Sequence, residues 1–348
     1  MKLISINELE VGDILDQDIE NDNGVVFAGT GTKVTHSILA RILNLSIDFI
    51  YVKDENESIV EDSGESFSFE AEINKDFANT VESFKNVFMS AKFGQKIIVD
   101  EFKTSVKPLV NNIINNDNIL GNLRSIKLND AYTYKHSINV GLVSTMIGKW
   151  LGYNENDLAD LVIAGMLHDI GKSKVPSSII DKKGPLNNGE FEIIQSHVDF
   201  GFEVLSATEG INENIKLGVR HHHERFGGGG YQLGLKGENI HEFGRIIAIA
   251  DIFDAMTSDR SYKSKISPFK VAEYIRELSF DHLDPRITGV FLRKIAHFYV
   301  GNKVKLNNGN AGEVILVNKS NYTKPLIRIG QDYVDLSKDY SIEIVDVI

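Results

Sequence analysis

A histidine and an aspartate stand side by side at the end of an apolar run, in the stretch Met166-Leu-His-Asp-Ile-Gly-Lys172. Burying a carboxylate there costs free energy unless a cation neutralises it. An imidazole next to a carboxylate can ligate a divalent metal ion, and Gly171 and Lys172 are typical of a helix exit that carries a positive charge. Because such a pair is common by chance, the rest of the chain has to support a metal site.

Histidines are concentrated in the middle of the chain, where six of the ten lie between His136 and His223. Each stands near an apolar stretch that would carry it into a helical bundle. The alternative for any single one is a histidine satisfied by its own hydrogen bond. As a set, five histidines and two aspartates satisfy one another best around two divalent cations. The candidates are His136, His168, Asp169, His197, the triplet His221 to His223, and Asp251.

Amphipathic helices are expected to position these side chains. Apolar residues at three- and four-residue spacing from Ile138 to Leu151 predict a helix that begins near His136. Asn154-Glu-Asn-Asp157 resembles a capping box, with Asp in place of the usual Glu or Gln, and opens a second helix that ends at the histidine–aspartate pair. Another helix is expected to carry His197.

Two further amphipathic stripes precede the histidine region, one beginning at Ile73 and one running from Phe102 to Ile114. They predict helices that pack on helices. The aromatic residues Phe77, Phe84 and Phe88 are expected in the core, or else in a dimer seam between helix pairs, rather than in a cofactor site.

The N-terminal part has short apolar stretches that predict a small α+β module. We expect strands at 14–15, 25–27 and 47–52 and a helix over 38–43. The acidic stretch from Lys53 to Glu65 is expected to be a solvated linker.

The C-terminal part is expected to change from helices to strands. Helices predicted from Pro268 and from Ile287 precede four predicted strands, which form a small β module without chemistry of its own. The predicted strands are 304–306, 314–317, 326–329 and 342–345. The predicted domains are 1–66 (α+β module and linker), 67–298 (helical catalytic domain, with core motifs at 129–263) and 299–348 (β module).

The composition is that of a soluble globular protein: 348 residues, 42% hydrophobic and 25% charged. No run approaches the roughly 18 apolar residues of a membrane span, and the first ten residues do not resemble a signal peptide, so a cytoplasmic location is expected. The lack of cysteine excludes disulfides, thiolate metal ligands and cysteine nucleophiles. A net charge of −12 argues against nonspecific nucleic-acid binding, and a phosphate substrate would need local cations.

The order of the motifs resembles the HD-GYP family, a subgroup of the HD phosphohydrolases. The resemblance covers Asn129 to Lys263 and implies a mainly α protein with an all-helical catalytic bundle of the HD type. It also implies hydrolysis of cyclic di-GMP at a binuclear or trinuclear centre, usually of iron or manganese. The motifs are Asp-x-Tyr-Thr-Tyr-x-His136, His168-Asp-Ile-Gly-Lys172, His197, His222-His-Glu-Arg225 with Gly230-Tyr231, and Asp251.

The resemblance implies a role for each ligand. One metal ion would be held by His136, His168, Asp169 and Asp251, and Asp169 would bridge to a second ion held by His197, His222 and His223. Neighbouring helical residues point about 100° apart, so His221 is expected behind the ligands or at the surface. Family members with a third ion carry a Glu where this chain has Tyr132, a poor ligand; we therefore predict two ions.

The substrate contacts implied by the resemblance are cationic or aromatic. Lys172 is expected beside the bridging carboxylate, where it would act in catalysis, and Arg260 and Lys263 are expected to hold the substrate phosphates. Tyr231 is expected to contact the substrate. The family's loop is altered here, with Gly227 in place of Asp and Gln232 in place of Pro.

Four successive glycines, Gly227 to Gly230, predict a flexible loop, so substrate preference or docking is where this chain is expected to depart from the family. The expected reaction is conversion of cyclic di-GMP to pGpG, and onward to GMP, by a metal-bridging hydroxide. One alternative is a weakly active cyclic-dinucleotide receptor, and another is a phosphohydrolase for a different nucleotide such as cyclic GMP-AMP. Expected partners are a second copy, through the helices at 70–116, and signalling proteins.

Overall fold

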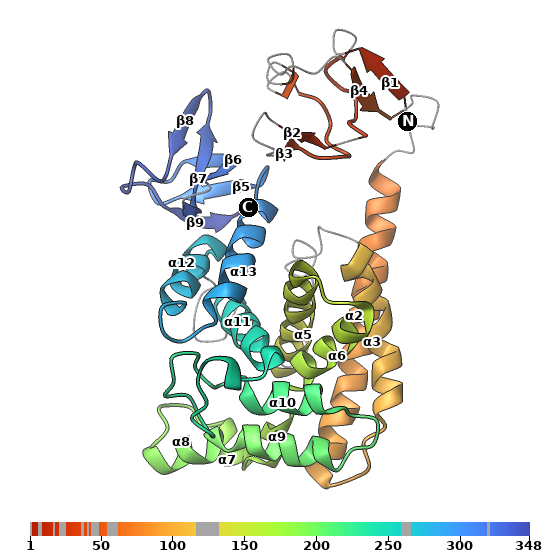
Figure 1. Ribbon diagram of the computed structural model, residues 1–348, viewed down its shortest axis with the longest axis vertical. Coiled ribbons are helices and arrows are strands. Elements are labelled where there is room, and N and C mark those ends of the chain that lie inside the picture. The colour runs from red at the N-terminus through yellow and green to blue at the C-terminus, as the bar shows by residue number, and fades with distance from the viewer. Residues whose placement is uncertain are drawn as a thin grey trace. The chain divides into compact units, whose positions relative to one another are not determined.

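The chain forms two compact units, Met1–Phe69 and Glu70–Ile348 (Figure 1). The second unit contains both the helices and a C-terminal sheet. The computed structural model describes residues 2–5, 9–16, 18–20, 26–35, 38–39, 42, 49–53, 62–115, 132–258, 266–318 and 321–348.

The first unit is built on two small antiparallel sheets. β1 (Lys2–Ser5) pairs with β4 (Phe49–Val52), and β2 (Ile19–Glu20) pairs with β3 (Val26–Ala28). Apolar side chains from the strands and their connections form one core. Its buried members are Leu9, Leu15, Ile19, Ala28, Val34, Ile42, Ile50 and Val52.

The strand pairing of this unit differs from the expected pattern. Ile14 and Leu15 form isolated bridges, to Lys33 and Val52, instead of a strand. The strand near 25–27 pairs with β2. The sequence did not reveal β2, because a strand of two residues is too short to show an alternating period.

One helix near the first unit lies at the predicted place, and another begins earlier than the sequence predicts. The helix expected over 38–43 is described only at 38–39 and 42, and these residues are helical. The stretch expected to be an acidic linker is already helical from Asp62, where α2 (Asp62–Phe93) begins, while residues 54–61 lie outside the described part. Acidic residues near the start of a helix favour it through the helix dipole, which explains the earlier start.

The second unit is mainly helical, as predicted, and its central helices α5, α6, α10 and α11 pack on one another. In the part of the chain that the structure describes, no helix is long and apolar enough to cross a membrane. After α2 come α3 (Val99–Asn115), α5 (Tyr132–Leu151), α6 (Glu155–Leu167), the 3-10 helix η2 (Ile170–Lys174), α7 (Ser177–Ile180), α8 (Asn188–Gln195), α9 (His197–Ser206), α10 (Glu213–His221), the 3-10 helix η3 (Gly237–Asn239), α11 (Glu242–Thr257), α12 (Pro268–Leu278) and α13 (Pro285–Phe298).

Helices α5 and α6 approach each other at a pair of glycines. A Cβ atom at Gly165 would lie 2.7 Å from Gly141 Cα, so neither position has room for a side chain. The N-terminus of α6 is capped as predicted, because the Asn154 side chain accepts hydrogen bonds from the backbone N–H groups of Asn156 and Asp157. The cap fixes where α6 begins, and the close contact holds the helix against α5; α6 ends at Leu167, with His168 as its C-cap.

Two of the three aromatic residues of the α2 stripe lie in the core, and the third, Phe88, is half-buried. Phe77 and Phe84 are buried, and the Phe84 ring lies 6.1 Å from the ring of Phe102 on α3 and 5.9 Å from that of Tyr134 on α5. Phe77 and Phe84 are therefore core residues, which is the favoured interpretation, and they are not available for a dimer seam. A homodimer through other residues of the helices at 70–116 stays a prediction.

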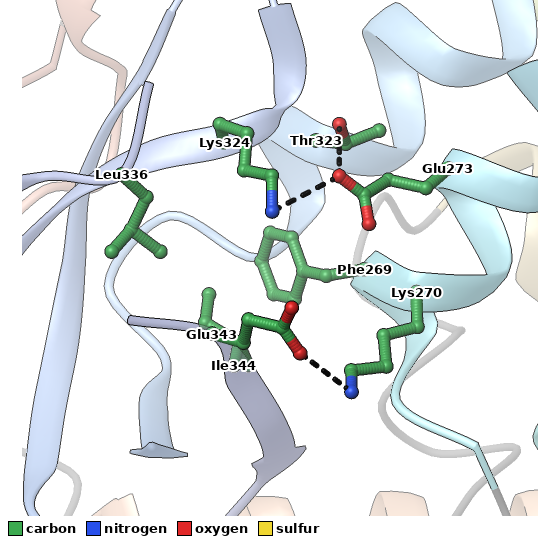
Figure 2. Close-up of a pocket in the computed structure, with 8 residues that line it drawn as sticks. All are labelled: Phe269, Lys270, Glu273, Thr323, Lys324, Leu336, Glu343 and Ile344. Carbon is green, nitrogen blue, oxygen red and sulfur yellow. Dashed lines mark hydrogen bonds and ion pairs between the residues drawn. The ribbon is translucent and has the colours of Figure 1, made fainter. Parts of the chain in front are cut away.

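The C-terminal strands form one antiparallel sheet in the order β8-β7-β6-β5-β9 that packs on α12 and α13. Phe269 of α12 is buried at this contact. Two ion pairs flank it, from Lys270 Nζ to Glu343 at 2.8 Å and from Lys324 Nζ to Glu273 at 3.1 Å (Figure 2). The strands are β5 (Lys303–Leu306), β6 (Ala311–Asn318), β7 (Asn321–Ile329), β8 (Asp332–Asp335) and β9 (Ile344–Val347).

We predict that Gly165→Ala lowers the free energy of unfolding by about 1–3 kcal/mol, because the added methyl group would overpack the contact between α5 and α6. Gly289→Ala is the matched control, because Gly289 also lies in a helix and a Cβ atom there meets no neighbour within 4 Å. The control should gain up to about 1 kcal/mol from better helix propensity. Urea unfolding of both variants checks this, and equal stabilities would contradict it.

Candidate metal centre

Side chains from five separate parts of the helical unit meet at one place. His136 comes from α5, His168 caps the C-terminus of α6, Asp169 follows it, and Asp251 comes from α11. His197 is the first residue of α9, and His222 and His223 follow α10. A helix carries His197, as expected, and the preceding helix α8 ends at Gln195, two residues earlier.

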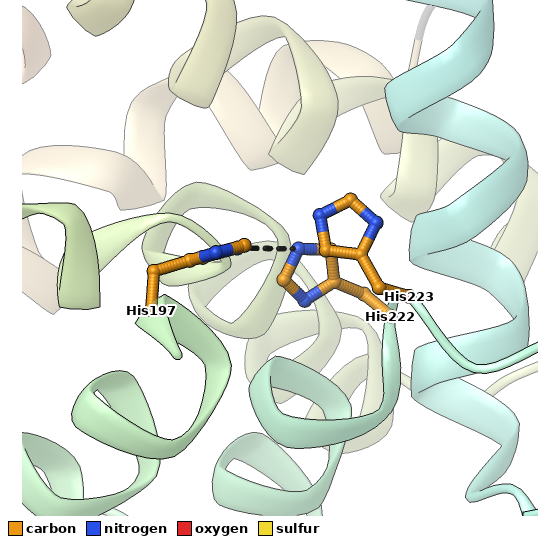
Figure 3. A group of neighbouring side chains, drawn as sticks. All are labelled: His197, His222 and His223. Atoms are coloured by element: carbon orange, nitrogen blue, oxygen red, sulfur yellow. Dashed lines mark hydrogen bonds between the residues drawn. The ribbon is translucent and has the colours of Figure 1, made fainter. Parts of the chain in front are cut away.

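These residues form two clusters of potential ligands. His136, His168 and Asp251 make one, and His197, His222 and His223 make the other (Figure 3). Within each cluster the ligand atoms lie within 4.8 Å of one another. A third combination, His168, Asp169 and His222, takes members from both sides and links the two clusters through Asp169.

The Asp169 carboxylate lies between the two clusters. Oδ2 is 3.3 Å from Nε2 of His168, and Oδ1 is 3.3 Å from Nε2 of His197. Among the described residues, the buried Oδ1 atom has no hydrogen-bond partner. A buried carboxylate oxygen without a hydrogen bond and facing imidazole nitrogens is satisfied by a cation, so the residues fit a metal ion.

Three of the imidazole rings are held in the tautomer that metal binding requires. Nδ1 of His168, His197 and His222 lies 2.8, 2.6 and 2.7 Å from the backbone carbonyl oxygen three residues earlier. A carbonyl only accepts hydrogen bonds, so Nδ1 carries the proton in each ring. The lone pair of a neutral ring is then on Nε2, which faces the centre.

His136 is oriented by an aspartate that the sequence analysis missed. Nδ1 lies 2.7 Å from Oδ2 of Asp254, and Nε2 lies 3.1 Å from Oδ1 of Asp251. Asp254 is buried and also accepts hydrogen bonds from Asn139 Nδ2 at 2.8 Å and Ser258 Oγ at 2.9 Å. The available signal was its position three residues after Asp251, on the same face of α11.

Burial and charge set the protonation of the two acidic ligands. Burial would raise the pKa of Asp169, but Lys172, with Nζ 2.5 Å from Oδ2, and His168 hold that pKa well below its usual range. The pKa of Asp251 is likewise lowered against the effect of burial, by its hydrogen bond to His136. Both aspartates are therefore ionised, as metal ligands must be.

The histidines divide into two electrostatic classes. Burial lowers the pKa of His197, lowers that of His222 well below its usual value, and brings that of His223 to about 4, so these rings are neutral at pH 7. Burial would also lower the pKa of His136, but Asp251 and Asp254 raise it to about 10. His136 would therefore give up its Nε2 proton on binding a metal ion, after which neutral imidazoles and ionised carboxylates together form the donor set of a divalent cation.

The expected substrate contacts are described only in part. The Tyr231 ring stacks on His223, with centroids 4.9 Å apart, and burial raises the pKa of its phenol. Arg260 and Lys263 lie outside the described residues, and the Tyr132 side chain is also outside them.

His221 has a structural role behind the ligands, which is one of the two positions expected for it. Its side chain is buried, and Nδ1 accepts a hydrogen bond of 3.0 Å from the backbone N–H of His241. His241 is the N-cap of α11, so this bond ties the end of α10 to the start of the helix that carries Asp251.

The glycine loop after His223 is anchored by Glu224, to which the sequence analysis assigned no role. The buried Glu224 carboxylate accepts hydrogen bonds from the backbone N–H groups of Leu233, Gly234 and Leu235, at 2.7, 3.1 and 3.0 Å. The four glycines expected to be flexible, 227–230, are thus followed by a segment, 233–235, that is hydrogen-bonded to Glu224. No side chain in this segment signals these bonds in the sequence, because the donors are backbone N–H groups.

A pocket of about 240 Å³ lies beside the second cluster. Its lining comes from the segments that carry the metal-ligand candidates and from α12 and the turn after it. The lining residues are His222, His223, Glu224, Arg225, Tyr231, Ala248, Asp251, Ile252, Tyr274, Leu278, His282 and Leu283.

Comparison with known proteins places these features in one family. A family model described as an HD domain matches residues 109–287. A protein named cyclic di-GMP phosphodiesterase from Pseudomonas aeruginosa is 31% identical over 246 residues, which are 70% of this chain and 59% of that protein. A protein named 3'3'-cGAMP-specific phosphodiesterase 1 from Vibrio cholerae is 33% identical over 208 residues, 60% of this chain and 45% of that protein. The chain thus spans only part of the length of these relatives.

The fold has a counterpart among solved structures. A protein described as an HDG"Y"P protein from Bdellovibrio bacteriovorus aligns with a TM-score of 0.52 over 83% of this chain and 97% of that one, at 14% identity. At this identity the likeness concerns the fold alone.

We predict that Glu224→Gln weakens the hydrogen bonds that hold residues 233–235. The amide keeps one acceptor oxygen and loses the charge that strengthens the three bonds. Hydrogen exchange at the backbone N–H groups of Leu233, Gly234 and Leu235 should become at least about tenfold faster. The control is Glu238→Gln, an exposed glutamate of η3, which should leave these rates unchanged. Unchanged protection in Glu224→Gln would contradict the anchoring role.

Proposed function

This chain belongs to the HD domain family, and from that membership we propose that it is a metal-dependent phosphodiesterase that hydrolyses cyclic di-GMP to pGpG and onward to GMP. One observation carries the proposal: two clusters of ligands share the buried carboxylate of Asp169, whose Oδ1 has no hydrogen-bond partner among the described residues. A pair of divalent ions bridged by one carboxylate is the arrangement that suits cleavage of a phosphodiester.

The proposed ligands are those expected from the sequence. His136, His168 and Asp251 would hold one ion, and His197, His222 and His223 would hold the other, with Asp169 shared between them. Iron or manganese is the proposed metal. When bound, the two ions supply Lewis-acid activation of the phosphodiester and of the attacking water.

The chain's own residues would position the substrate and balance charge. Lys172 is paired with Asp169 and its side chain is one-third exposed, so its ammonium group would also be available to a phosphate bound at the ligand clusters. Tyr231, fixed against His223, would form the pocket wall nearest the ligands. Arg260 and Lys263 stay proposed as phosphate contacts. Together with the metals, these cations would reverse the field that the net charge of −12 creates.

Cyclic GMP-AMP is a second candidate substrate, favoured by the relative from Vibrio cholerae, whose printed name carries that specificity. Both substrates are cyclic dinucleotides with the same phosphodiester chemistry, so the ligand clusters do not distinguish them. The altered loop, with Gly227 and Gln232, is where a difference in preference would arise.

We predict that metal-loaded protein converts cyclic di-GMP to pGpG, and that Asp169→Ala reduces turnover by at least about a thousandfold, because it removes the ligand shared by both ions. Lys172→Ala should retain both metals and lower turnover by about 10- to 100-fold. Chromatography of the products and metal analysis of each variant provide the measurements. A metal-loaded wild-type protein that yields neither pGpG nor GMP would rule out the proposed activity.

We predict about two metal ions per chain after anaerobic purification, measured by elemental analysis, in agreement with two ligand clusters. A value near three would contradict this number.

Asp254→Asn should weaken metal affinity about 10- to 100-fold, because the amide no longer fixes the tautomer of His136. The matched control is Asp284→Asn, another buried aspartate, whose carboxylate pairs with Arg245 at 2.7 Å. This control should lose stability while keeping its metal affinity, as measured by competition with a chelator. Equal affinities in the Asp254 variant and the wild type would remove Asp254 from the proposed site.

A further inference from the structure

The pocket beside the second ligand cluster is lined by side chains of different chemistry. Its polar part includes the ligand side chains and Tyr231, whose ring already has His223 stacked on it. Ile252, Tyr274, Leu278 and Leu283 add apolar and aromatic surface. A ligand that combines a phosphate with a flat apolar surface matches this lining.

We propose that Tyr274 is a specificity-determining residue whose ring stacks on a purine base of the substrate. The proposal rests on the phosphodiesterase function proposed above and names the residue that recognises the base. Tyr274 is 43% exposed although it lines the pocket, and none of the described aromatic rings stacks on it. Its ring surface is thus available to a ligand, whereas the Tyr231 ring is partly covered by His223. Stacking on an aromatic side chain is a common way to bind a nucleobase.

The helix that carries Tyr274 is held at both ends. At its start, Phe269 is buried against the C-terminal sheet, and the ion pairs of Lys270 with Glu343 and of Glu273 with Lys324 flank it (Figure 2). Glu273 is the residue directly before Tyr274, so the sheet fixes the backbone at the stacking position. A ring whose position is fixed before binding loses little entropy when a base stacks on it.

The end of the same helix is tied to the glycine loop. The backbone N–H groups of Phe226 and Gly227 donate to the carbonyl oxygens of His282 and Asp281, at 2.8 and 2.6 Å. A Cβ atom at position 227 would lie 2.5 Å from the Asp281 oxygen, so glycine is what permits this approach. Gly227, which stands where the family has Asp, therefore permits the loop to lie against the turn that follows α12.

The polar lining of the pocket fits a purine that has acceptors on its edge. Arg225 lines the same pocket as Tyr274. In the sequence it lies between the ligand histidines and the four glycines. A guanidinium group presents paired donors that match the O6 and N7 acceptors of guanine. The base expected on Tyr274 is therefore guanine, which both candidate dinucleotides contain.

The test compares two ligands that differ by the base and that contain no phosphodiester bond. GMP has a guanine, a ribose and a phosphate, whereas ribose 5-phosphate lacks the guanine. Isothermal titration calorimetry with metal-loaded, full-length protein gives a Kd for each. The ratio of the Kd of ribose 5-phosphate to that of GMP measures the contribution of the base, and in the wild type it should be at least about tenfold.

Tyr274→Ala should lower this ratio by about fivefold to 100-fold, mainly by weakening GMP binding, while the Kd of ribose 5-phosphate stays constant. Tyr274→Phe keeps the aromatic face and should keep the ratio. Tyr274→Leu keeps apolar volume without a π face and should lose most of it. Tyr333→Ala, which removes an exposed tyrosine of β8, is the matched control and should leave both Kd values unchanged.

Two results would overturn the proposal: a wild-type protein that binds both ligands equally, or a folded Tyr274→Ala variant with the wild-type ratio. Circular dichroism establishes that each variant is folded. The proposed phosphodiesterase activity fails separately, through absence of hydrolysis of cyclic di-GMP. A protein that shows the Tyr274-dependent ratio but does not cleave this substrate would retain the base site and lose the proposed function.

Discussion

The structure of the helical unit depends on the burial of one charged group, the Asp169 carboxylate. Removing a carboxylate from water costs several kcal/mol, and Lys172 contacts only one of its two oxygens. The remaining compensation is what a metal ion held by the surrounding histidines and Asp251 would supply. The helices are arranged accordingly: α6 ends at His168, and α9 begins with His197 on the other side of the carboxylate. Close packing at Gly171, where a Cβ atom would lie 2.5 Å from Gly201 N, brings η2 and α9 together.

Much of this centre could be predicted from the sequence, because five histidines and two aspartates occur in order beside apolar stretches and the helical periods around them are strong. The predicted ligands lie together, and the cap at Asn154 and the helices at Pro268 and 285–298 are found where the pattern indicated them. Residues that act through long-range contacts were missed. Asp254 and Glu224 have roles only because distant segments, α5 and residues 233–235, lie against them. A periodic pattern carries no information about such tertiary contacts.

The glycine loop illustrates how composition alone can mislead. Four successive glycines predict mobility, since each residue has few backbone constraints. In the folded chain the same glycines permit contacts that a side chain would prevent, as at Gly227 against Asp281 and at Gly230, where a Cβ atom would lie 2.5 Å from the Arg225 nitrogen. Lack of a side chain here permits closer packing and more backbone hydrogen bonds. The loop and the C-terminal sheet hold opposite ends of α12, so both contribute to the position of the helix that lines the pocket.

The hydrogen bonds that orient His168, His197 and His222 have an evolutionary consequence. Each ring donates to the main-chain carbonyl three residues before it, an acceptor that every amino acid provides. The acceptors at Ile194 and Val219 therefore do not depend on residue type, and a substitution there that keeps the backbone in place keeps the direction of the ligand atoms. Gly165 is constrained for another reason, its close contact with α5. His136 is different, because its partner is the side chain of Asp254, on another helix. Of the four rings, it is the one whose orientation a single substitution elsewhere in the chain could abolish.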